Sequence, residues 1–304
     1  MSRFRLTPCA VNPALSAPGR APEAGTALGD PDHVELRAVS KTFAAARRLI
    51  PAVDAVSMRI PRGRFVSLIG LSGCGKSTLL RIVAGLLAPD AGTVSIFGET
   101  PAAASAAKHI GFVPQRPALL PWRTVLDNVR LPLQVNTRAN GSSSGAGRDG
   151  DDRAREMLES LGLASARDLR PRQLSGGMQQ RAALARALVF EPAILLMDEP
   201  FSALDEISRE EQGRNLLRVW EANQKTVLFV THSIPEAVAL SDTVYVMSGA
   251  PGTIQAEVPV DLPRPRGEGV ASTSAFHQLE DRLRAELRRA REGHADARRE
   301  EVRG

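Results

Sequence analysis

The chain has 304 residues, 43% of them hydrophobic and 24% charged, with a formal net charge of +5. This composition is ordinary for a globular protein, and the length is enough to bury a large core. No apolar run approaches the roughly 18 residues of a membrane-spanning helix, and Pro8 and Pro13 interrupt any signal-peptide core near the start. The only two cysteines, Cys9 and Cys74, predict reduced thiols and a cytosolic location. The positive charge is dispersed, which indicates a composition bias rather than a nucleic-acid-binding stripe.

The first half of the chain alternates between strand and helix patterns after an irregular start. Residues 1–32, rich in Pro, Ala and Gly, predict a disordered extension. The apolar run Phe65–Ile69 is typical of a strand buried on both faces, and it leads into a glycine-rich loop. The other elements predicted here are strands at Val34–Val39, Val53–Ile60, Thr93–Phe97 and Ile110–Val113, and a helix at Lys76–Leu87.

The second half continues the alternation after a low-complexity segment, residues 136–152, which predicts a flexible surface linker. Such alternation predicts an α/β fold whose mostly parallel sheet is covered on both faces. In the tail, Phe276, Leu279, Leu283 and Leu287 recur at helical spacing, and a helix packed on its own domain is favoured over one that binds a partner. The elements predicted here are helices at Ala154–Leu161, after Ser175, at Arg209–Ala222 and at Pro235–Leu240, and strands at Ala193–Met197 and Thr226–Val230.

The glycine-rich loop Gly70-Leu-Ser-Gly-Cys-Gly-Lys-Ser77 has the phosphate-loop pattern in the required context, after a strand and at the start of a helix. Its glycines let backbone N–H groups point at phosphate oxygens, and the helix start adds a positive dipole end. Lys76 provides a charge for the β- and γ-phosphates, and the Ser77 hydroxyl is a Mg²⁺ ligand. We expect the Cys74 thiol to lie against the phosphates, where a bulky reagent would inhibit. The predicted nucleotide-binding residues of this loop are Gly70, Ser72, Gly73, Cys74, Gly75, Lys76, Ser77 and Thr78.

A second candidate feature is the apolar strand Ile194–Met197, which ends in two carboxylates, Asp198 and Glu199. Such pairs often only solvate a strand end. In a chain that also carries a phosphate loop, however, Asp198 is predicted to hold Mg²⁺ and Glu199 to act as general base toward the attacking water.

A second glycine motif, Leu174-Ser-Gly-Gly-Met-Gln-Gln-Arg181, opens another helix with Ser175 as a plausible N-cap. One ATP needs only one phosphate loop. A physical resolution is that two copies of the protein face each other, so that Ser175, Gly176 and Gly177 of each copy contact the γ-phosphate held by the other.

This segment resembles the signature motif of ABC ATPases, and the surrounding motifs follow that family's order over about residues 34–250. The resemblance implies a P-loop NTPase of the ABC type, with a mostly parallel core sheet, an antiparallel β subdomain and a helical signature subdomain. It implies an ATPase domain over residues 33–260, with the helical subdomain at about 116–190, and a tail at 261–304 that contains a helix. An apparent short insertion, Ala44–Pro51, follows Phe43, which matches the family's adenine-stacking aromatic.

The resemblance also implies further site residues. Gln115 matches the glutamine that senses Mg²⁺ and the membrane partner, and Asp205 matches the loop that reaches across the dimer. His232 matches the switch histidine at the γ-phosphate, and Phe43 matches the aromatic that stacks on adenine, although a core role for Phe43 is nearly as plausible. The implied cofactors are ATP and Mg²⁺, and Glu199, His232, Lys76 and Gln115 are the implied catalytic residues.

Three segments resemble the nitrate, sulfonate and taurine importer ATPases: residues 119–129 (LLPWRTVLDNV), 231–242 and 251–254. This resemblance implies a homodimer on the cytoplasmic face of the inner membrane, permease subunits and an extracytoplasmic binding protein. Trp122 in the first segment suits either a permease-docking surface or a small core cluster. Alternatives are a soluble ABC ATPase acting on nucleic acid or ribosomes, which usually carries two cassettes, and a small-metabolite kinase, which does not account for Leu174–Arg181.

Overall fold

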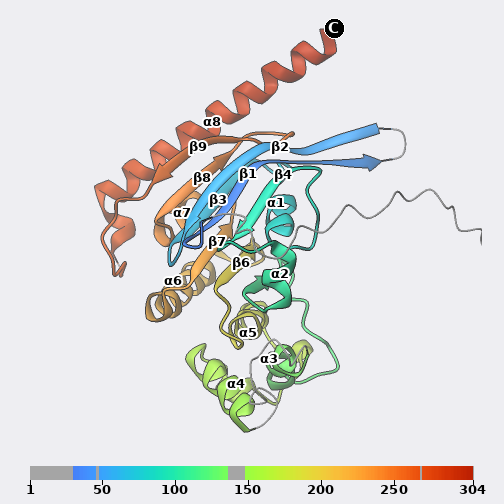
Figure 1. The fold of residues 1–304 in the computed structure, drawn as a ribbon. Helices are drawn as coiled ribbons and strands as arrows, with labels where there is room; N and C mark the ends of the chain where they lie inside the picture. The colour runs from blue at the N-terminus through green and yellow to red at the C-terminus, as the bar shows by residue number, and fades with distance from the viewer. Residues whose placement is uncertain (1–29, 46–47, 136–147, 268, 304) are drawn as a thin grey trace, which may run out of the picture.

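The computed structural model describes residues 30–45, 48–135, 148–267 and 269–303, and two sheets organise them (Figure 1). The larger sheet has six strands in the order β5-β6-β7-β3-β8-β9. Five of them are parallel, and only β9 runs antiparallel to its neighbour β8. The strands are β3 (Phe65–Gly70), β5 (Ile110–Val113), β6 (Ile194–Asp198), β7 (Thr226–Val230), β8 (Thr243–Met247) and β9 (Ile254–Pro259).

The strand order of this sheet places the predicted nucleotide-binding and catalytic residues at one edge. Every residue of β3, β6 and β7 is buried, as expected of parallel strands covered on both faces. Because β7 pairs with both β3 and β6, the phosphate loop after β3, Glu199 after β6 and His232 after β7 leave the sheet side by side at its carboxyl edge. Ligands of open α/β sheets bind at this edge.

The smaller sheet is antiparallel, with the order β2-β1-β4, and it confirms the expected antiparallel subdomain. The two predicted short strands are too short, because β1 and β2 continue as one ladder to the pair Ala45 and Arg48. The described residues of the apparent insertion, 44–45 and 48–51, belong to this hairpin, which projects from the molecule in Figure 1. Its strands are β1 (His33–Ala45), β2 (Arg48–Pro61) and β4 (Ala91–Ile96).

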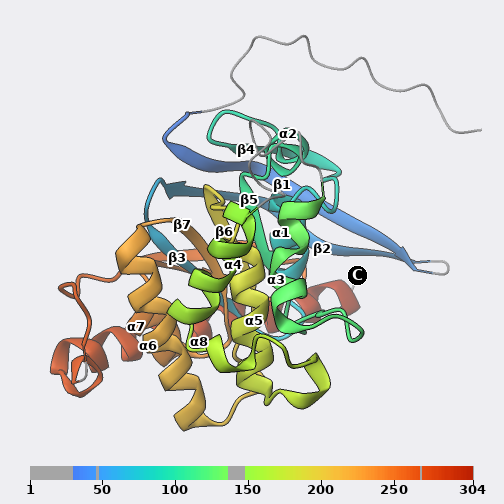
Figure 2. The same cartoon turned by 90° about the horizontal axis from the view of Figure 1, so that it is seen from below.

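A helical region, which includes α3, α4 and α5, lies at one end of the molecule, in front in Figure 2. The linker predicted at 136–152 is wrong in its last part, because α4 begins at Arg148 and continues the charged segment as a helix; residues 136–147 lie outside the described residues. We did not predict α3 as a helix, although Thr124 caps it by accepting from the Asp127 N–H. The helices that cover the core sheet or build this region are α1 (Lys76–Val83), α2 (Pro101–Ala106), α3 (Val125–Gln134), α4 (Arg148–Ser160), α5 (Gly176–Leu188), α6 (Glu206–Asn223) and α7 (Ile234–Leu240).

The tail forms a long helix, α8 (Ser274–Arg303), that packs on its own domain as predicted. Phe276 and Leu283 are buried in a cluster with residues of β8, β9 and α7, and Leu279 and Leu287 are partly buried against it. Within the described part of the chain, neither this helix nor any other combines the length and apolarity needed to cross a membrane.

Candidate nucleotide-binding and hydrolysis site

The phosphate loop follows β3 with the geometry that its sequence predicts. Gly73 and Gly75 have φ angles of 79° and 95°, and a Cβ on Gly75 would lie 2.5 Å from the carbonyl oxygen of Ala52, so only glycine fits there. Helix α1 begins at Lys76, and no side chain caps its amino end. The uncapped N–H groups therefore form an anion-binding site.

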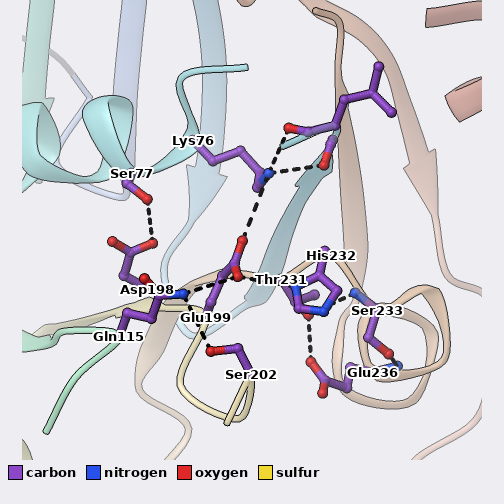
Figure 3. A network of polar contacts seen from close by, with 12 residues as sticks. Lys76, Ser77, Gln115, Asp198, Glu199, Ser202, Thr231, His232, Ser233 and Glu236 are labelled. Carbon is purple, nitrogen blue, oxygen red and sulfur yellow. Dashed lines mark hydrogen bonds and ion pairs between the residues drawn. The ribbon is translucent and has the colours of Figure 1, made fainter. Parts of the chain in front are cut away.

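Lys76 lies across the mouth of this loop. Its Nζ donates to the carbonyl oxygens of Gly70 and Leu71 at 2.9 and 3.0 Å, and it lies 3.9 Å from Glu199 Oε1 (Figure 3). The side chain is almost fully buried, so its charge is poorly screened by solvent. A buried, fixed ammonium group beside free helix N–H groups favours a phosphate ligand.

The Cys74 side chain does not lie where we predicted it. It is 1% exposed and packs in the core cluster beneath the loop, and burial raises the pKa of its thiol. The expectation of a thiol against the phosphates is therefore wrong: only the backbone of Cys74 belongs to the loop surface. Two further residues predicted in this loop also have side chains: Ser72 is exposed, and Thr78 is half-buried in the first turn of α1.

A turn that the sequence analysis did not assign to the site supports the loop from behind. Gly252 donates its N–H to the Ala52 carbonyl at 3.0 Å and accepts from the Asp54 N–H at 2.9 Å. A Cβ on Gly252 would overlap the carbonyl oxygen of Cys74 in the phosphate loop. This close backbone approach requires glycine after Pro251. In the sequence, residues 251–254 stood out only because they resemble the corresponding segment of the importer ATPases.

The two carboxylates at the end of β6, Asp198 and Glu199, point to different partners. Asp198 accepts a 2.8 Å hydrogen bond from the Ser77 hydroxyl, and burial raises the pKa of its carboxyl group. Glu199 has a φ angle of 44°, in the left-handed region, a conformation that costs about 1–3 kcal/mol in a non-glycine residue. The two side chains therefore divide, with Asp198 bonded to Ser77 and Glu199 directed toward Gln115 and His232.

Glu199 is the hub of the site, as Figure 3 shows. Its Oε2 lies 3.1 Å from Nδ1 of His232 and 3.5 Å from Nε2 of Gln115. Gln115 also donates to the Ser202 hydroxyl at 3.4 Å, a contact that the sequence analysis missed. Three of the other predicted residues, Lys76, Gln115 and His232, thus meet around the Glu199 carboxylate.

Four further residues support His232 and were not predicted as site residues. The Thr231 hydroxyl donates to Glu236 Oε2 at 2.5 Å, and Arg209 Nε lies 3.3 Å from the other oxygen of Glu236. Burial raises the pKa of this carboxyl group. Ser233 caps α7 by accepting from the Glu236 N–H. The Ser-x-x-Glu spacing is a capping-box pattern, so the sequence held a signal for Glu236, whereas Arg209 is brought in by tertiary packing alone.

The structure does not bring five predicted residues into this network. Ser175 caps α5 and Asp205 caps α6, and the hydrogen bonds of both side chains are local to those caps. Gly176 and Gly177 have only Leu204 near the position of a Cβ, at 3.9 and 4.0 Å. Phe43 lies 40% exposed on the β1–β2 hairpin. Among the described residues, none of the five hydrogen-bonds to the residues around Glu199.

The donor set around Ser77 fits a magnesium ion. Ser77 and Asp198 offer a hydroxyl and a carboxylate oxygen within hydrogen-bonding distance of each other. In the described part of the chain no group of three His, Cys, Asp or Glu residues forms a complete metal cage. Mg²⁺ commonly binds to one or two protein oxygens and completes its shell with substrate phosphates and water, so this pair suits it when ATP is present.

Comparison with known proteins agrees with this geometry. The ABC transporter family model matches residues 53–202. The aliphatic sulfonates import ATP-binding protein SsuB of Burkholderia ambifaria is 42% identical over 252 residues, which cover 83% of this chain and 71% of that protein. The nitrate import ATP-binding protein NrtD of Synechocystis sp. is 40% identical, over 76% of this chain and 84% of that protein.

Among solved structures, the chain is similar to the ATP-binding cassette MJ0796 in a dimeric post-hydrolysis state bound to ADP and Pi. The TM-score is 0.67 at 36% sequence identity, and the match covers 76% of this chain and all of that one. A second dimeric structure of the same cassette, described as a bacterial ABC transporter cassette, matches equally well.

Proposed function

The chain belongs to the ABC transporter ATPase family as an ATP-binding and ATP-hydrolysing subunit, and on that premise we propose that it energises an importer. The proposed assembly has two copies of this chain on the cytoplasmic face of the inner membrane, with separate permease subunits and an extracytoplasmic binding protein. The observation that carries the importer assignment is the extended similarity to import ATP-binding proteins, over 76–83% of this chain.

We assign the residues of the site the following roles in ATP hydrolysis. Lys76 and the loop N–H groups hold the β- and γ-phosphates, and the 3.9 Å approach of its Nζ to Glu199 brings the phosphate site next to the base. Glu199 accepts a proton from the water that attacks the γ-phosphorus atom. His232, 3.1 Å from the Glu199 carboxylate, orients that base and contacts the γ-phosphate. Ser77, Asp198 and Gln115 are the proposed Mg²⁺ ligands, and the ion would neutralise charge on the phosphates.

The signature segment acts on the other copy of the chain in this proposal. Ser175, Gly176 and Gly177 lie at the amino end of α5, where N–H groups and the helix dipole favour an anion. Because they do not hydrogen-bond to the site of their own chain, a γ-phosphate held by a second copy is the ligand that the proposal gives them. Asp205 is the proposed contact across the dimer, and Phe43 the proposed adenine platform.

Trp122 is the proposed permease contact, and hydrogen bonds from Asn128 and Arg186 tie its loop to the neighbouring helices. The side chain is 69% exposed. Nearby, the buried Asn128 accepts from the Leu120 N–H at 2.7 Å and donates to the Leu120 carbonyl at 3.1 Å. Arg186 of α5 donates to the carbonyls of residues 117 and 118, both at 2.8 Å, and so ties this loop to the signature helix. An exposed tryptophan on a fixed loop suits a docking anchor better than a core cluster.

The transported compound in this proposal is a small anion such as nitrate, a sulfonate or taurine, with support from the substrates in the relatives' names. The test is a pull-down of the tagged chain from native membranes, with mass spectrometry of the proteins recovered and Trp122→Ser as the matched variant. We expect a permease with several membrane spans from the unmodified chain and much less of it from the variant. Ribosomes or nucleic acid without a permease would contradict the importer assignment and leave the ATPase intact.

A further inference from the structure

Arg209, near the start of α6, joins two parts of the molecule that lie on either side of it. Its Nη2 donates to the Leu204 carbonyl at 3.1 Å, and its Nε forms an ion pair of 3.3 Å with Glu236 Oε1. The paired side chains are only 25% and 11% exposed, so solvent screens them less than a surface pair. Because a guanidinium group presents its donors in a rigid planar fork, Arg209 holds the loop before α6 and helix α7 at a fixed separation.

The Glu236 end of this link reaches the backbone around His232. The Thr231 hydroxyl donates to the second oxygen of Glu236 at 2.5 Å and accepts from the Ser233 N–H at 3.0 Å (Figure 3). Glu236 therefore holds, through one hydroxyl, the residues on both sides of His232. The His232 side chain is 53% exposed, whereas Thr231 is buried. The position of the imidazole thus depends on this backbone more than on packing around the ring.

The Leu204 end of the link reaches the signature segment, residues 175–177. A Cβ placed on Gly176 or Gly177 would lie 3.9 or 4.0 Å from Leu204 Cδ2, so the Leu204 side chain faces the amino end of α5. Leu204 also directly precedes Asp205, which caps α6 and is exposed. One end of the link therefore lies at the residues to which the proposed function gives contacts with a second copy of the chain.

We propose that Arg209 is a positioning residue for ATP hydrolysis, which ties His232 to the segment that meets the second copy. The inference rests on the proposed function, because it uses the roles given there to His232 and to the signature segment. Arg209 touches neither ATP nor the reacting atoms. Its contacts with Leu204 and Glu236 keep the His232 Nδ1 at 3.1 Å from Glu199 Oε2.

The consequence of this link is a coupling between the two ATP sites of the dimer. A signature segment that engages the γ-phosphate held by the second copy fixes Leu204, and through Arg209 and Glu236 it fixes His232 of its own copy. Hydrolysis in each site therefore depends on occupancy of the other. Chains of hydrogen bonds and ion pairs of this kind can carry such coupling between sites.

NMR spectra of the full chain, isotope-labelled at its histidine nitrogens and free of ATP, test the link directly. The chain has five histidines, and His232→Ala assigns the ring signal of His232. We expect Arg209→Gln to change this signal, because the shorter, uncharged side chain loses the ion pair with Glu236. Arg218→Gln, which removes an exposed arginine of the same helix, is the control and should leave the signal unchanged. An unchanged His232 signal in Arg209→Gln would overturn the proposal.

A double-mutant cycle separates this link from a general effect on the fold. Thr231→Val removes the hydroxyl that Glu236 accepts from and keeps the branched shape of the side chain. We expect Thr231→Val to change the His232 signal, and Arg209→Gln to add much less to that change than it causes alone. Additive changes would overturn the link, since a purely structural role of Arg209 predicts them. Should Arg209→Gln not fold, Arg209→Met, which keeps the apolar stem and lacks the donors, replaces it with the same expected results.

Steady-state kinetics and light scattering measure the effect on hydrolysis. We expect Arg209→Gln to lower kcat about fivefold, equivalent to about 1 kcal/mol, with KM for ATP almost unchanged. Adding Arg209→Gln to the Glu199→Gln chain should leave the ATP-bound dimer intact. An unchanged kcat, or loss of that dimer, would overturn the positioning role. An unmodified chain that never hydrolyses ATP would instead contradict the function proposed above and leave the NMR result standing, so the two failures are distinguishable.

Discussion

Gly252→Ala tests the backbone contact that supports the phosphate loop from behind. The Gly252 φ angle is not in the left-handed region, so alanine is compatible with the backbone and the effect of the change is steric. The new Cβ would overlap the Cys74 carbonyl and the Cε atom of Met247. The turn has little freedom to withdraw, because Gly252 is bonded on both sides, to Ala52 at 3.0 Å and Asp54 at 2.9 Å.

The size of the effect follows from this overlap. Inserting a methyl group into a packed site costs about 1–3 kcal/mol. For a domain of this length, a loss of about 2 kcal/mol lowers the Tm by roughly 4–8 °C. Part of the strain should reach the phosphate loop, because the Cys74 carbonyl belongs to it. We therefore also expect ATP affinity to fall about tenfold, equivalent to about 1.4 kcal/mol.

Thermal unfolding and binding of a fluorescent ATP analogue measure the two effects. Gly267→Ala is the matched control, since a Cβ there has no neighbour within 4 Å and its φ angle is also not positive. The free energy of unfolding of this control should lie within about 0.5 kcal/mol of that of the unmodified chain. If Gly252→Ala melts and binds ATP as the unmodified chain does, or if the control loses as much, the support assigned to the turn is refuted.

Three other predictions follow from the site. Glu199→Gln should lower kcat at least about 100-fold with ATP affinity retained, because it removes the general base, and steady-state kinetics with nucleotide-binding measurements check this. Cys74 should react slowly with a bulky maleimide whether or not ATP is present, because its thiol is buried with a raised pKa; rapid labelling that ATP suppresses would contradict this. Burial raises the pKa of Glu236 above 4.5, so the folded state holds this proton more tightly than the unfolded state, and stability from this group is lost as pH rises through the folded pKa. Glu236→Gln should reduce this loss of stability, which thermal unfolding measures from acidic to neutral pH. An unchanged dependence of stability on pH would contradict the raised pKa of Glu236.

The elements most accurately predicted from the sequence are the buried parallel strands. Thr226–Val230 was predicted to the residue because short, continuous apolar runs are typical of strands that are covered on both faces. Ile110–Val113, an edge strand whose residues alternate between partly buried and buried, was also predicted to the residue. Helix α3 was missed because Pro132 lies inside it, and a proline interrupts the helical pattern on which such a prediction depends. The extended hairpin was underestimated because residues near its tip, such as Leu49 at 76% exposure, follow no inside-outside alternation.

In the candidate site, the residues that belong to sequence motifs were predictable, and the residues that hold them in position were not. Lys76, Glu199 and His232 meet as the motif order indicates. Arg209 and Gly252 act through contacts with segments distant in the chain, and no local pattern reveals such contacts. The Cys74 error has the same origin: a position in a motif does not say whether its side chain faces the ligand or the core.

The most direct test of the account is the mass of the Glu199→Gln chain in solution with ATP, measured by light scattering during size-exclusion chromatography. A site completed by the second copy predicts that ATP converts a species of 32.6 kDa into one of twice that mass. Adding Ser175→Arg to the same chain should abolish this dimer without abolishing ATP binding, because the arginine disrupts only the signature segment. A Glu199→Gln chain that binds ATP and stays monomeric, or a double variant that dimerises equally well, would contradict the account.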